Sequence, residues 1–276
     1  MKLFYAPQSP FARKVRAAAI ELGLDQRIQL EYAEVVPGRP NKTFAQSGNP
    51  LRRIPALVTD AGDTIFDSTV ICEYLDALVG GGKLIPRDDS RRWRVLTNHA
   101  LAQGMCESVI LIRYETWLRP VAARWSVWVD DHWDKIHSGL DWFEHNKNEL
   151  NAPIDLAQLA LGCLLGYVDF RWPDHGWRER FPNVSTWFAR LEQRPSFAKT
   201  KPELPPPSRR PYSPHNRASR CPLWVKSRHQ RMSTSCPLYP RKRTLVVGVR
   251  TSTLSQKQTI AGHIMPPSGI RRNRVS

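Results

Sequence analysis

The sequence has few cysteines, and none of them stands at the spacing of a metal or redox motif. The 276 residues include five cysteines, at positions 72, 106, 163, 221 and 236, with no C-x-x-C pair and no histidine at a zinc-site distance. This pattern argues against a zinc domain and against a disulfide oxidoreductase motif. We therefore expect reduced, buried cysteines, no bound metal ion and a cytoplasmic protein.

Long hydrophobic runs are also missing. Lys2 is followed by only a short apolar run, which lacks the length of a secretory leader. The most apolar stretch, residues 156–168, is shorter than a membrane span and contains Gln158 and two glycines. We expect no signal peptide, no membrane-spanning helix and no membrane partner.

Acidic residues are nearly absent from the end of the chain. Residues 201–276 carry 16 Lys and Arg and a single acid, Glu203, whereas residues 1–200 carry 25 Lys and Arg and 24 acids. Low apolar content and unbalanced charge predict a disordered basic tail over 201–276. This tail is either an arm that attracts nucleic acid non-specifically or incidental sequence. The lack of aromatic spacing favours incidental sequence.

The informative part of the chain begins at its first residue. A short apolar run at 2–5 is followed by a loop and then by a helical stretch over 10–22, which stops at Gly23. Pro10 suits the first helical turn because it has no N–H to leave unpaired. Ser9 then stands at the N-cap, where free backbone N–H groups and the helix dipole stabilise an anion such as a thiolate. The alternative is that Ser9 only caps the helix.

Two further signals follow in a fixed order. An Ile54-Pro55 step runs into the apolar stretch 56–58, and Asp67-Ser68 opens an amphipathic helix over 68–78. Together with the Ser-Pro-Phe start, these signals resemble the N-terminal domain of the glutathione transferase superfamily. The opening looks like the bacterial serine-type members, and the resemblance covers residues 1–200.

The resemblance implies a thioredoxin-like α/β domain followed by an all-α helical bundle. Strands that alternate with helices and then form a hairpin agree with this fold. We predict domains at 1–79 and 90–200, joined by a linker at 80–89. The expected strands are 2–5, 29–34, 56–58 and 64–66; the expected helices are 10–22, 43–46, 68–78 and 91–117, helix in 120–150, and two more that open at Asp155 and Phe181. Asp155 and Gln158 have the spacing of a capping box, in which Asp155 caps the helix and the Gln158 side chain reaches back to the cap residue.

The resemblance also implies a glutathione site. Ser9 would donate a hydrogen bond to the thiolate of glutathione. The backbone of Ile54, before a cis Pro55, would pair with the cysteinyl part. Asp67 would hold the γ-glutamyl ammonium and Ser68 the γ-glutamyl carboxylate. An ordinary trans proline and a simple helix cap are the alternatives for these two signals.

By the same resemblance, Arg53 would pair with the glycyl carboxylate. A hydrophobic electrophile would lie between the loop after the first strand and the first long helix of the second domain. Arg113, Tyr114 and Trp117 fall there, and the two aromatic residues are i, i+3 neighbours that would line an apolar pocket. The alternative is that these aromatic residues belong to the core.

The activity implied by the resemblance is that of a glutathione transferase with a detoxifying role. The co-substrate glutathione would be activated as a thiolate for attack on an electrophilic small molecule, in a homodimer. The alternative is a non-catalytic binding or regulatory member of the fold with a basic arm. The presence of all three signals together favours the enzyme.

Overall fold

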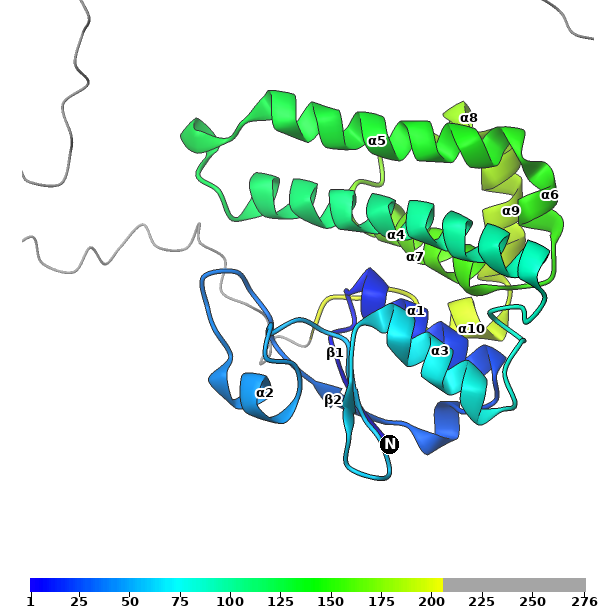
Figure 1. The fold of residues 1–276 in the computed structure, drawn as a ribbon. Coiled ribbons are helices and arrows are strands. Elements are labelled where there is room, and N and C mark those ends of the chain that lie inside the picture. The colour runs from blue at the N-terminus through cyan, green and yellow to red at the C-terminus, as the bar shows by residue number, and fades with distance from the viewer. Residues whose placement is uncertain (206–276) are drawn as a thin grey trace, which may run out of the picture. The chain divides into compact units, whose positions relative to one another are not determined.

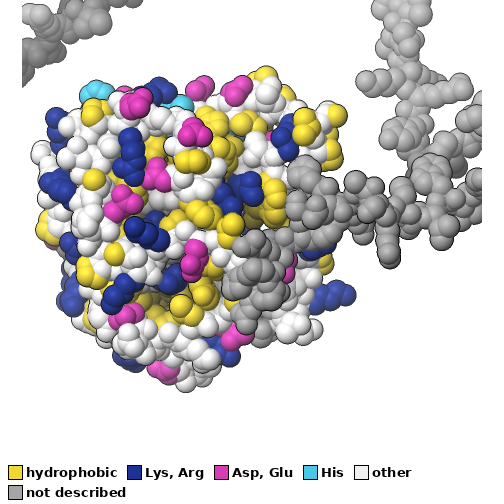
Figure 2. Space-filling view, turned by 180° about the vertical axis from the view of Figure 1, so that it is seen from behind, with side chains coloured by type: hydrophobic (Ala, Val, Ile, Leu, Met, Phe, Trp, Pro, Cys, Tyr) yellow, Lys and Arg dark blue, Asp and Glu magenta, His cyan; other side chains and the backbone are white. Residues whose placement is uncertain are grey.

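The computed structural model describes residues 1–205, which fall within one compact unit (Figure 1). The predicted tail lies, from residue 206 on, outside the described residues, as do Cys221 and Cys236. The division into domains at 1–79 and 90–200 stays a prediction. On the face seen in Figure 2, basic and acidic side chains are interspersed, in agreement with the balanced charge of residues 1–200.

A mixed four-stranded sheet forms the base of the N-terminal part. It consists of β1 (Lys2–Tyr5), β2 (Gln29–Tyr32), β3 (Ala56–Val58) and β4 (Thr64–Ile65), in the order β2-β1-β3-β4. β2 runs parallel to β1, β3 runs antiparallel to β1, and β4 runs antiparallel to β3. This arrangement confirms the predicted thioredoxin-like fold. β2 ends two residues earlier, and β4 one residue earlier, than the sequence pattern predicted.

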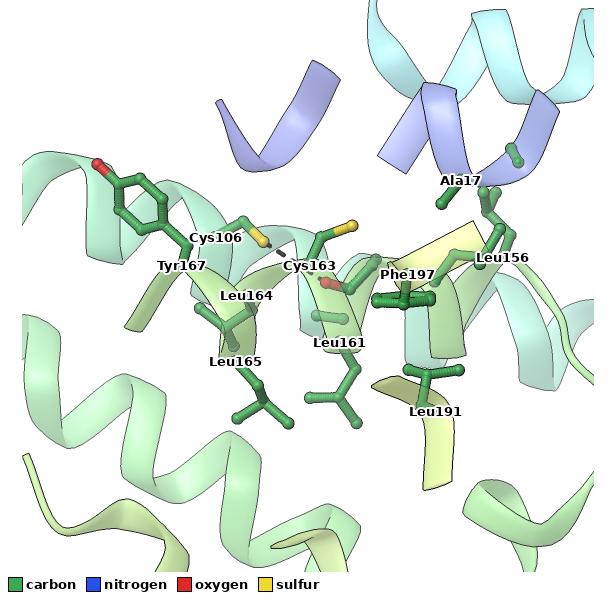
Figure 3. Close-up of a cluster of buried hydrophobic side chains, with 14 of the residues drawn as sticks. Ala17, Cys106, Leu156, Leu161, Cys163, Leu164, Leu165, Tyr167, Leu191 and Phe197 are labelled. Atoms are coloured by element: carbon green, nitrogen blue, oxygen red, sulfur yellow. Dashed lines mark hydrogen bonds between the residues drawn. The ribbon is translucent and has the colours of Figure 1, made fainter. Parts of the chain in front are cut away.

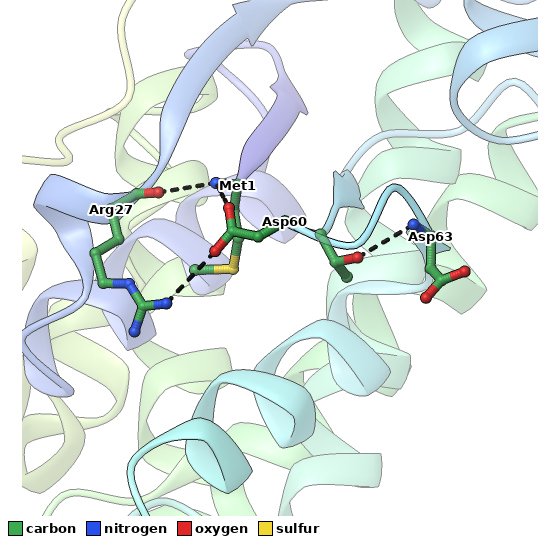
Figure 4. Close-up of polar contacts among 5 residues, drawn as sticks. Met1, Arg27, Asp60 and Asp63 are labelled. Atoms are coloured by element: carbon green, nitrogen blue, oxygen red, sulfur yellow. Dashed lines mark hydrogen bonds and ion pairs between the residues drawn. The ribbon is translucent and has the colours of Figure 1, made fainter.

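Polar contacts fasten the start of β1 to the turn between β3 and β4 (Figure 4). The ammonium group of Met1 donates to the carbonyl of Arg27 at 3.2 Å and to the carboxylate of Asp60 at 2.5 Å. The hydrogen bond from this ammonium lowers the pKa of the Asp60 carboxyl. Within the turn, the N–H of Asp63 donates to the hydroxyl of Thr59. The first residue of the chain is therefore part of the sheet's framework.

Two helices cover one face of the sheet and separate it from the rest of the molecule (Figure 1). They are α1 (Pro10–Glu21) and α3 (Ser68–Leu78), and a short 3-10 helix, η1 (Asp25–Arg27), follows α1. The chain leaves α1 through Gly23 at a φ of 71°, the left-handed conformation that the sequence predicted for this glycine. A third helix, α2 (Lys42–Ser47), packs Phe44 edge-on against Phe4 of β1.

The remaining described residues are helical, as predicted. The elements are α4 (Asp89–Trp117), η2 (Val121–Ala123), α5 (Ser126–His145), α6 (Lys147–Asn151), α7 (Leu156–Arg171), α8 (Trp177–Arg180), α9 (Pro182–Glu192) and α10 (Pro195–Ala198). The Trp-rich stretch 120–150 divides into three of them, and α8 and α10 were not predicted. α4 begins two residues early because the side chain of Asp88 accepts the N–H of Arg91 at 2.9 Å and caps the helix.

α7 forms the centre of the hydrophobic core. Every residue from Leu156 to Val168 is buried, because α1, α4 and α9 surround the helix. Figure 3 shows its leucines among Cys106, Leu191 and Phe197. A helix buried on all sides is apolar all round, which explains why this stretch was the most apolar of the sequence. Within residues 1–205, no helix has both the length and the hydropathy needed to cross a membrane.

The start of α7 confirms one half of the predicted capping box and corrects the other. Asp155 accepts the N–H of Gln158 at 3.0 Å, as a cap should. The Gln158 side chain does not return to the cap residue. Its amide instead donates to the carbonyls of Glu149, Ala152 and Pro153, at 3.0 to 3.2 Å. The chain before α7 turns back toward the helix, so three of its carbonyls lie within reach of the Gln158 amide. The sequence alone does not show this turn.

Burial raises the pKa of the Asp155 carboxyl to about 6. The folded chain therefore holds this proton more tightly than the unfolded chain, whose aspartates titrate near pH 3.9. Between these two values, stability falls as the pH rises. Asp155→Asn keeps a capping side chain but does not titrate. As the pH rises from 4 to 7, we expect the free energy of unfolding of this variant to increase by up to about 3 kcal/mol relative to that of the parent. Urea unfolding at each pH measures this difference.

The matched control is Asp88→Asn, the same change at the exposed cap of α4. The backbone hydrogen bond from Arg91 lowers the pKa of Asp88, so the stability that Asp88 contributes is present above pH 3.9 and is lost as the pH falls. As the pH rises, the free energy of unfolding relative to the parent should therefore increase for Asp155→Asn and decrease for Asp88→Asn. Equal pH profiles for parent and Asp155→Asn would contradict the assignment of a buried, titrating cap.

The linker after α3 is fixed by one carboxylate. Asp76, which is 3% exposed, accepts four backbone N–H groups, and its two oxygens lie 3.0 to 3.3 Å from the nitrogens of residues 82–85. The next contact along the chain is equally direct, because the N–H of Leu156 donates to the carbonyl of Leu84 at 3.0 Å. The segment predicted as a linker is thus anchored to both α3 and α7.

Candidate functional site

The sheet topology brings the three predicted signals to one edge. The loop that leads to Ser9 leaves the carboxyl end of β1. β3 is antiparallel to β1 with Ala56 opposite Phe4, so Pro55, directly before β3, lies at the same end. β4 reverses direction once more, and its carboxyl end leads to Asp67. Residues far apart in the sequence therefore converge at this edge, next to the N-termini of α1 and α3.

Ser9 is the N-cap of α1, as predicted. Its backbone is extended, at φ −80° and ψ 122°, and its Oγ accepts the N–H of Ala12 at 3.2 Å. Because the oxygen acts as the acceptor in this cap, the hydroxyl proton remains available for donation to a ligand. The side-chain oxygen of the preceding residue, Gln8, is buried and has no hydrogen-bond partner among residues 1–205. Polar groups thus gather at the positive end of the helix.

The Ile54–Pro55 peptide is cis. Within the described residues, neither the N–H nor the carbonyl of Ile54 forms a hydrogen bond. The loop before it is shaped by Asn49, which is 3% exposed, accepts the N–H of Leu51 at 2.9 Å and donates to the carbonyl of Arg53 at 3.1 Å. Sequence analysis did not single out Asn49, although an Asn-Pro pair before a turn was its signal. The Arg53 side chain is exposed on this loop.

Asp67 and Ser68 stand at the start of α3 and have different environments. Asp67 is exposed and caps the helix with one oxygen, Oδ1, which accepts the N–H groups of Thr69 at 2.9 Å and Val70 at 3.4 Å. Its Oδ2 forms no hydrogen bond or ion pair with residues 1–205. Ser68 is buried, and its Oγ has no hydrogen-bond partner in the described part of the chain. Such a buried hydroxyl needs an explanation, and a ligand supplies one.

Sequence analysis missed a buried lysine beside this edge. Lys14 of α1 is 1% exposed, and its ammonium donates to Gln103 Oε1 at 2.9 Å and to His99 Nε2 at 3.0 Å, with Thr69 Oγ1 at 3.5 Å. Burial, followed by the charge of Lys14, lowers the pKa of His99 to about 3. The ring is therefore neutral and its Nε2 accepts. A basic pair at 13 and 14, among the apolar residues of a helix, was the available signal.

The three residues predicted for the electrophile pocket all lie on the C-terminal part of α4, half-buried. The Arg113 guanidinium stacks on the Trp117 ring at 4.7 Å. Burial raises the pKa of Tyr114, and the charge of Arg53 acts on it in the opposite direction, so Arg53 and Tyr114 are near one another. Of the three residues, Tyr114 therefore lies within reach of the loop that carries Arg53.

The C-terminal end of α7 reaches the same region. Arg13, in the first turn of α1, lies against Gly166 in the second half of α7, where a side chain would overlap its guanidinium. The second half of α7 therefore lies at the Ser9 end of α1. Arg171, in the last turn of α7, stacks on the rings of Phe170 at 4.4 Å and Tyr167 at 5.6 Å. Local sequence held no signal for it.

Three cysteines within the described residues are buried and free, as predicted. Burial raises the pKa of Cys72 to about 12 and that of Cys163 to about 11, and it raises the pKa of Cys106 as well. These thiols are therefore protonated and unreactive at neutral pH. Among residues 1–205, no group of three or more His, Cys, Asp or Glu side chains is arranged to hold a metal ion.

Comparison with known proteins shows the family of the chain. The family model for the glutathione S-transferase N-terminal domain matches residues 3–83, and that for the C-terminal domain matches residues 126–190. The chain is 32% identical to the uncharacterized GST-like protein YibF of Escherichia coli K12, over 73% of this chain and 98% of YibF.

Solved structures are also similar. One is a glutathione transferase family member from Pseudomonas fluorescens Pf-5 with bound glutathione, at 41% identity and a TM-score of 0.71, over 74% of this chain and 99% of that one. Another, also from Pseudomonas fluorescens Pf-5, holds S-(propanoic acid)-glutathione, at 40% identity and a TM-score of 0.68, over 73% and 99%. Both domain models and these relatives show that the chain belongs to the glutathione transferase superfamily.

Proposed function

We propose that this chain is a serine-type glutathione transferase, in which Ser9 stabilises the thiolate of glutathione for attack on an electrophilic small molecule. The observation that carries the proposal is the geometry of Ser9: an N-cap whose oxygen is already an acceptor and whose proton is free to donate. It stands at the edge where Ile54 and Asp67 also converge. Similar proteins solved with bound glutathione and with bound S-(propanoic acid)-glutathione support glutathione as the ligand.

The thiolate needs modest stabilisation. A free cysteine thiol has a pKa of about 8.5, and lowering it by about two units requires roughly 2.7 kcal/mol. One charge-assisted hydrogen bond contributes about 1.5–3 kcal/mol, and a helix N-terminus adds about 0.3–1 kcal/mol. Ser9 and the α1 terminus together are therefore of the required size. Ser9 acts as a hydrogen-bond donor and does not need to accept the thiol proton.

The other residues at this edge would hold the tripeptide. The free backbone groups of Ile54 suit the cysteinyl part, in the manner of an added strand. The unpaired Oδ2 of Asp67 suits the γ-glutamyl ammonium, while the partnerless Ser68 hydroxyl and the α3 N-terminus suit the carboxylate. Exposed Arg53 suits the glycyl carboxylate. A homodimer, a cytoplasmic location and a detoxifying role belong to the same proposal through the family.

Titration calorimetry on the full chain tests the binding part of this proposal. Glutathione should bind with a Kd between micromolar and millimolar, as small polar ligands do. The ultraviolet absorbance of the thiolate should appear at neutral pH in the complex, and chlorodinitrobenzene should be turned over. Asp67→Asn should weaken binding, because the ammonium loses its charged partner. Binding without thiolate or turnover would instead indicate a non-catalytic member of the family, and no binding would refute the site.

A further inference from the structure

Arg113 and Arg171 lie in the C-terminal parts of two helices that pack against each other, α4 and α7. α4 and α7 run side by side in the same direction, since the Cys106 thiol lies 3.8 Å from the carbonyl of Ala160 and, further along both helices, the charge of Arg113 acts on Tyr167. The charge of Arg171 is close enough to act on Arg113, whose pKa is lowered first by burial and then by this repulsion. Both belong to the end of the molecule where α1 begins.

Neither arginine has a counter-ion in the part of the chain that the structure describes. Within residues 1–205, no carboxylate forms a salt bridge with Arg113 or Arg171, and Arg171 Nε is buried without a hydrogen-bond partner. The acids nearest in sequence are already paired elsewhere: Glu115 with Arg119 at 2.7 Å, and Asp169 with Arg178 at 2.6 Å. Two partly desolvated like charges side by side are unfavourable until an anion joins them.

The aromatic rings orient the two guanidinium groups. The Arg113 guanidinium lies over Trp117, and the Arg171 guanidinium lies over Phe170 and Tyr167. A ring that covers the face of a guanidinium leaves its N–H edge for hydrogen bonding, and that edge matches a carboxylate. Such stacked, rigid forks are better suited to a planar anion than flexible surface arginines would be.

We propose that Arg113 and Arg171 bind the carboxylate of the electrophilic substrate, so that this chain prefers acidic electrophiles to neutral ones. The inference rests on the proposed function, since it assigns the second substrate of the same site. It changes one expectation from the sequence: the proposed pocket at Tyr114 and Trp117 would be apolar on its aromatic side and cationic where the two helices end. The anion would fix the ring of the substrate next to the glutathione sulfur.

The test uses two electrophiles that differ in a single group, chlorodinitrobenzoate and chlorodinitrobenzamide. In both, the glutathione sulfur attacks the carbon that bears chlorine, a C–S bond forms, the C–Cl bond breaks, chloride leaves, and the thiol proton goes to solvent. Each enzymatic rate is divided by the uncatalysed rate, so that the intrinsic reactivity of the two compounds cancels. We expect kcat/KM of the full chain to favour the acid by about ten- to a hundredfold, the range of one or two charge-assisted hydrogen bonds.

The variants are Arg113→Gln and Arg171→Gln, singly and together, with Arg171→Lys as the conservative change. The double variant should raise KM for the acid by about ten- to a hundredfold and leave KM for the amide nearly unchanged. The lysine variant should keep part of the preference, because it retains charge but loses the fork. Arg94→Gln is the control, because Arg94 lies near the other end of α4 with a side chain that is 66% exposed.

The outcomes separate the two proposals. No turnover of either compound contradicts the proposed function itself. Turnover of both compounds without a preference for the acid overturns the carboxylate site and leaves the proposed function standing. An equal loss of both activities in the double variant also overturns it, because a purely structural role affects acid and amide alike. Loss of the acid preference in Arg94→Gln would show that net charge, rather than this pair of arginines, decides.

Discussion

Ser9→Ala is expected to lower the turnover of glutathione conjugation by about ten- to a thousandfold, the range found when one donor to a developing or bound anion is removed. The dissociation constant of glutathione should change far less, because in the proposed site Ile54, Asp67 and Ser68 would hold the rest of the tripeptide. The pH–rate profile should move toward higher pH, since the thiol loses the hydrogen bond that favours its ionised form. Steady-state kinetics across pH, together with calorimetry, measure both effects.

The same substitution removes a helix cap, which costs about 1 kcal/mol of stability. Asp88→Ala provides the matched control, since it removes the cap of α4 at the start of that helix and should leave turnover unchanged. Ser9→Thr retains a hydroxyl and should keep most of the activity. If Ser9→Ala retained the parent rate and profile, the thiolate would be stabilised by the backbone N–H groups of α1 alone.

Acid should destabilise the chain through His99. In the folded state this ring stays neutral down to a pH of about 3 because it is buried and faces the Lys14 ammonium. In the unfolded state an ordinary histidine takes up a proton near pH 6.5. Stability is thus fully present above pH 6.5 and declines as the pH falls. Between pH 7.5 and pH 5 the loss should be about 2 kcal/mol, measured as the free energy of unfolding in urea.

His99→Gln isolates this effect. Glutamine offers Lys14 an oxygen in place of Nε2 and does not titrate. As the pH falls from 7.5 to 5, the free energy of unfolding of the variant should therefore rise by about 2 kcal/mol relative to that of the parent. His145→Gln is the control, because the His145 side chain is 73% exposed and lies far along α5. Parallel pH profiles for His99→Gln and the parent would show that the ring is free to take up a proton in the folded state.

Much of the fold followed from local signals. Ser9-Pro10, Asp67-Ser68 and Asp155 open helices in the structure because capping depends on a few neighbouring residues. The strands were found from short apolar runs with turn residues between them. The division of residues 120–150 into η2, α5 and α6 was not predicted. The apolar residues Trp125 and Val127 resemble the buried face of a helix in the sequence, but both side chains are exposed in the structure.

The electrostatics of the site could not be predicted in this way. Lys14 and Arg13 suggest a solvent-facing basic pair, yet both are buried, because α3, α7 and α10 pack against α1. Arg171 is separated from Arg113 by more than fifty residues, and only the parallel packing of α4 and α7 brings them together. Burial and charge pairing depend on helices that meet late in the chain, so no local pattern records them.

The four hydrogen bonds to Asp76 have a consequence for how the site works. A linker held by one buried carboxylate, and fastened to α7 through Leu84, cannot serve as a hinge. In the proposed site, the residues assigned to glutathione and those assigned to the electrophile would therefore keep a fixed spacing, and substrates would enter without closure about this linker. The choice among substrates would then depend on the shape and charge of side chains that are already in place. A change of side chain could alter this choice without altering the backbone that holds the site.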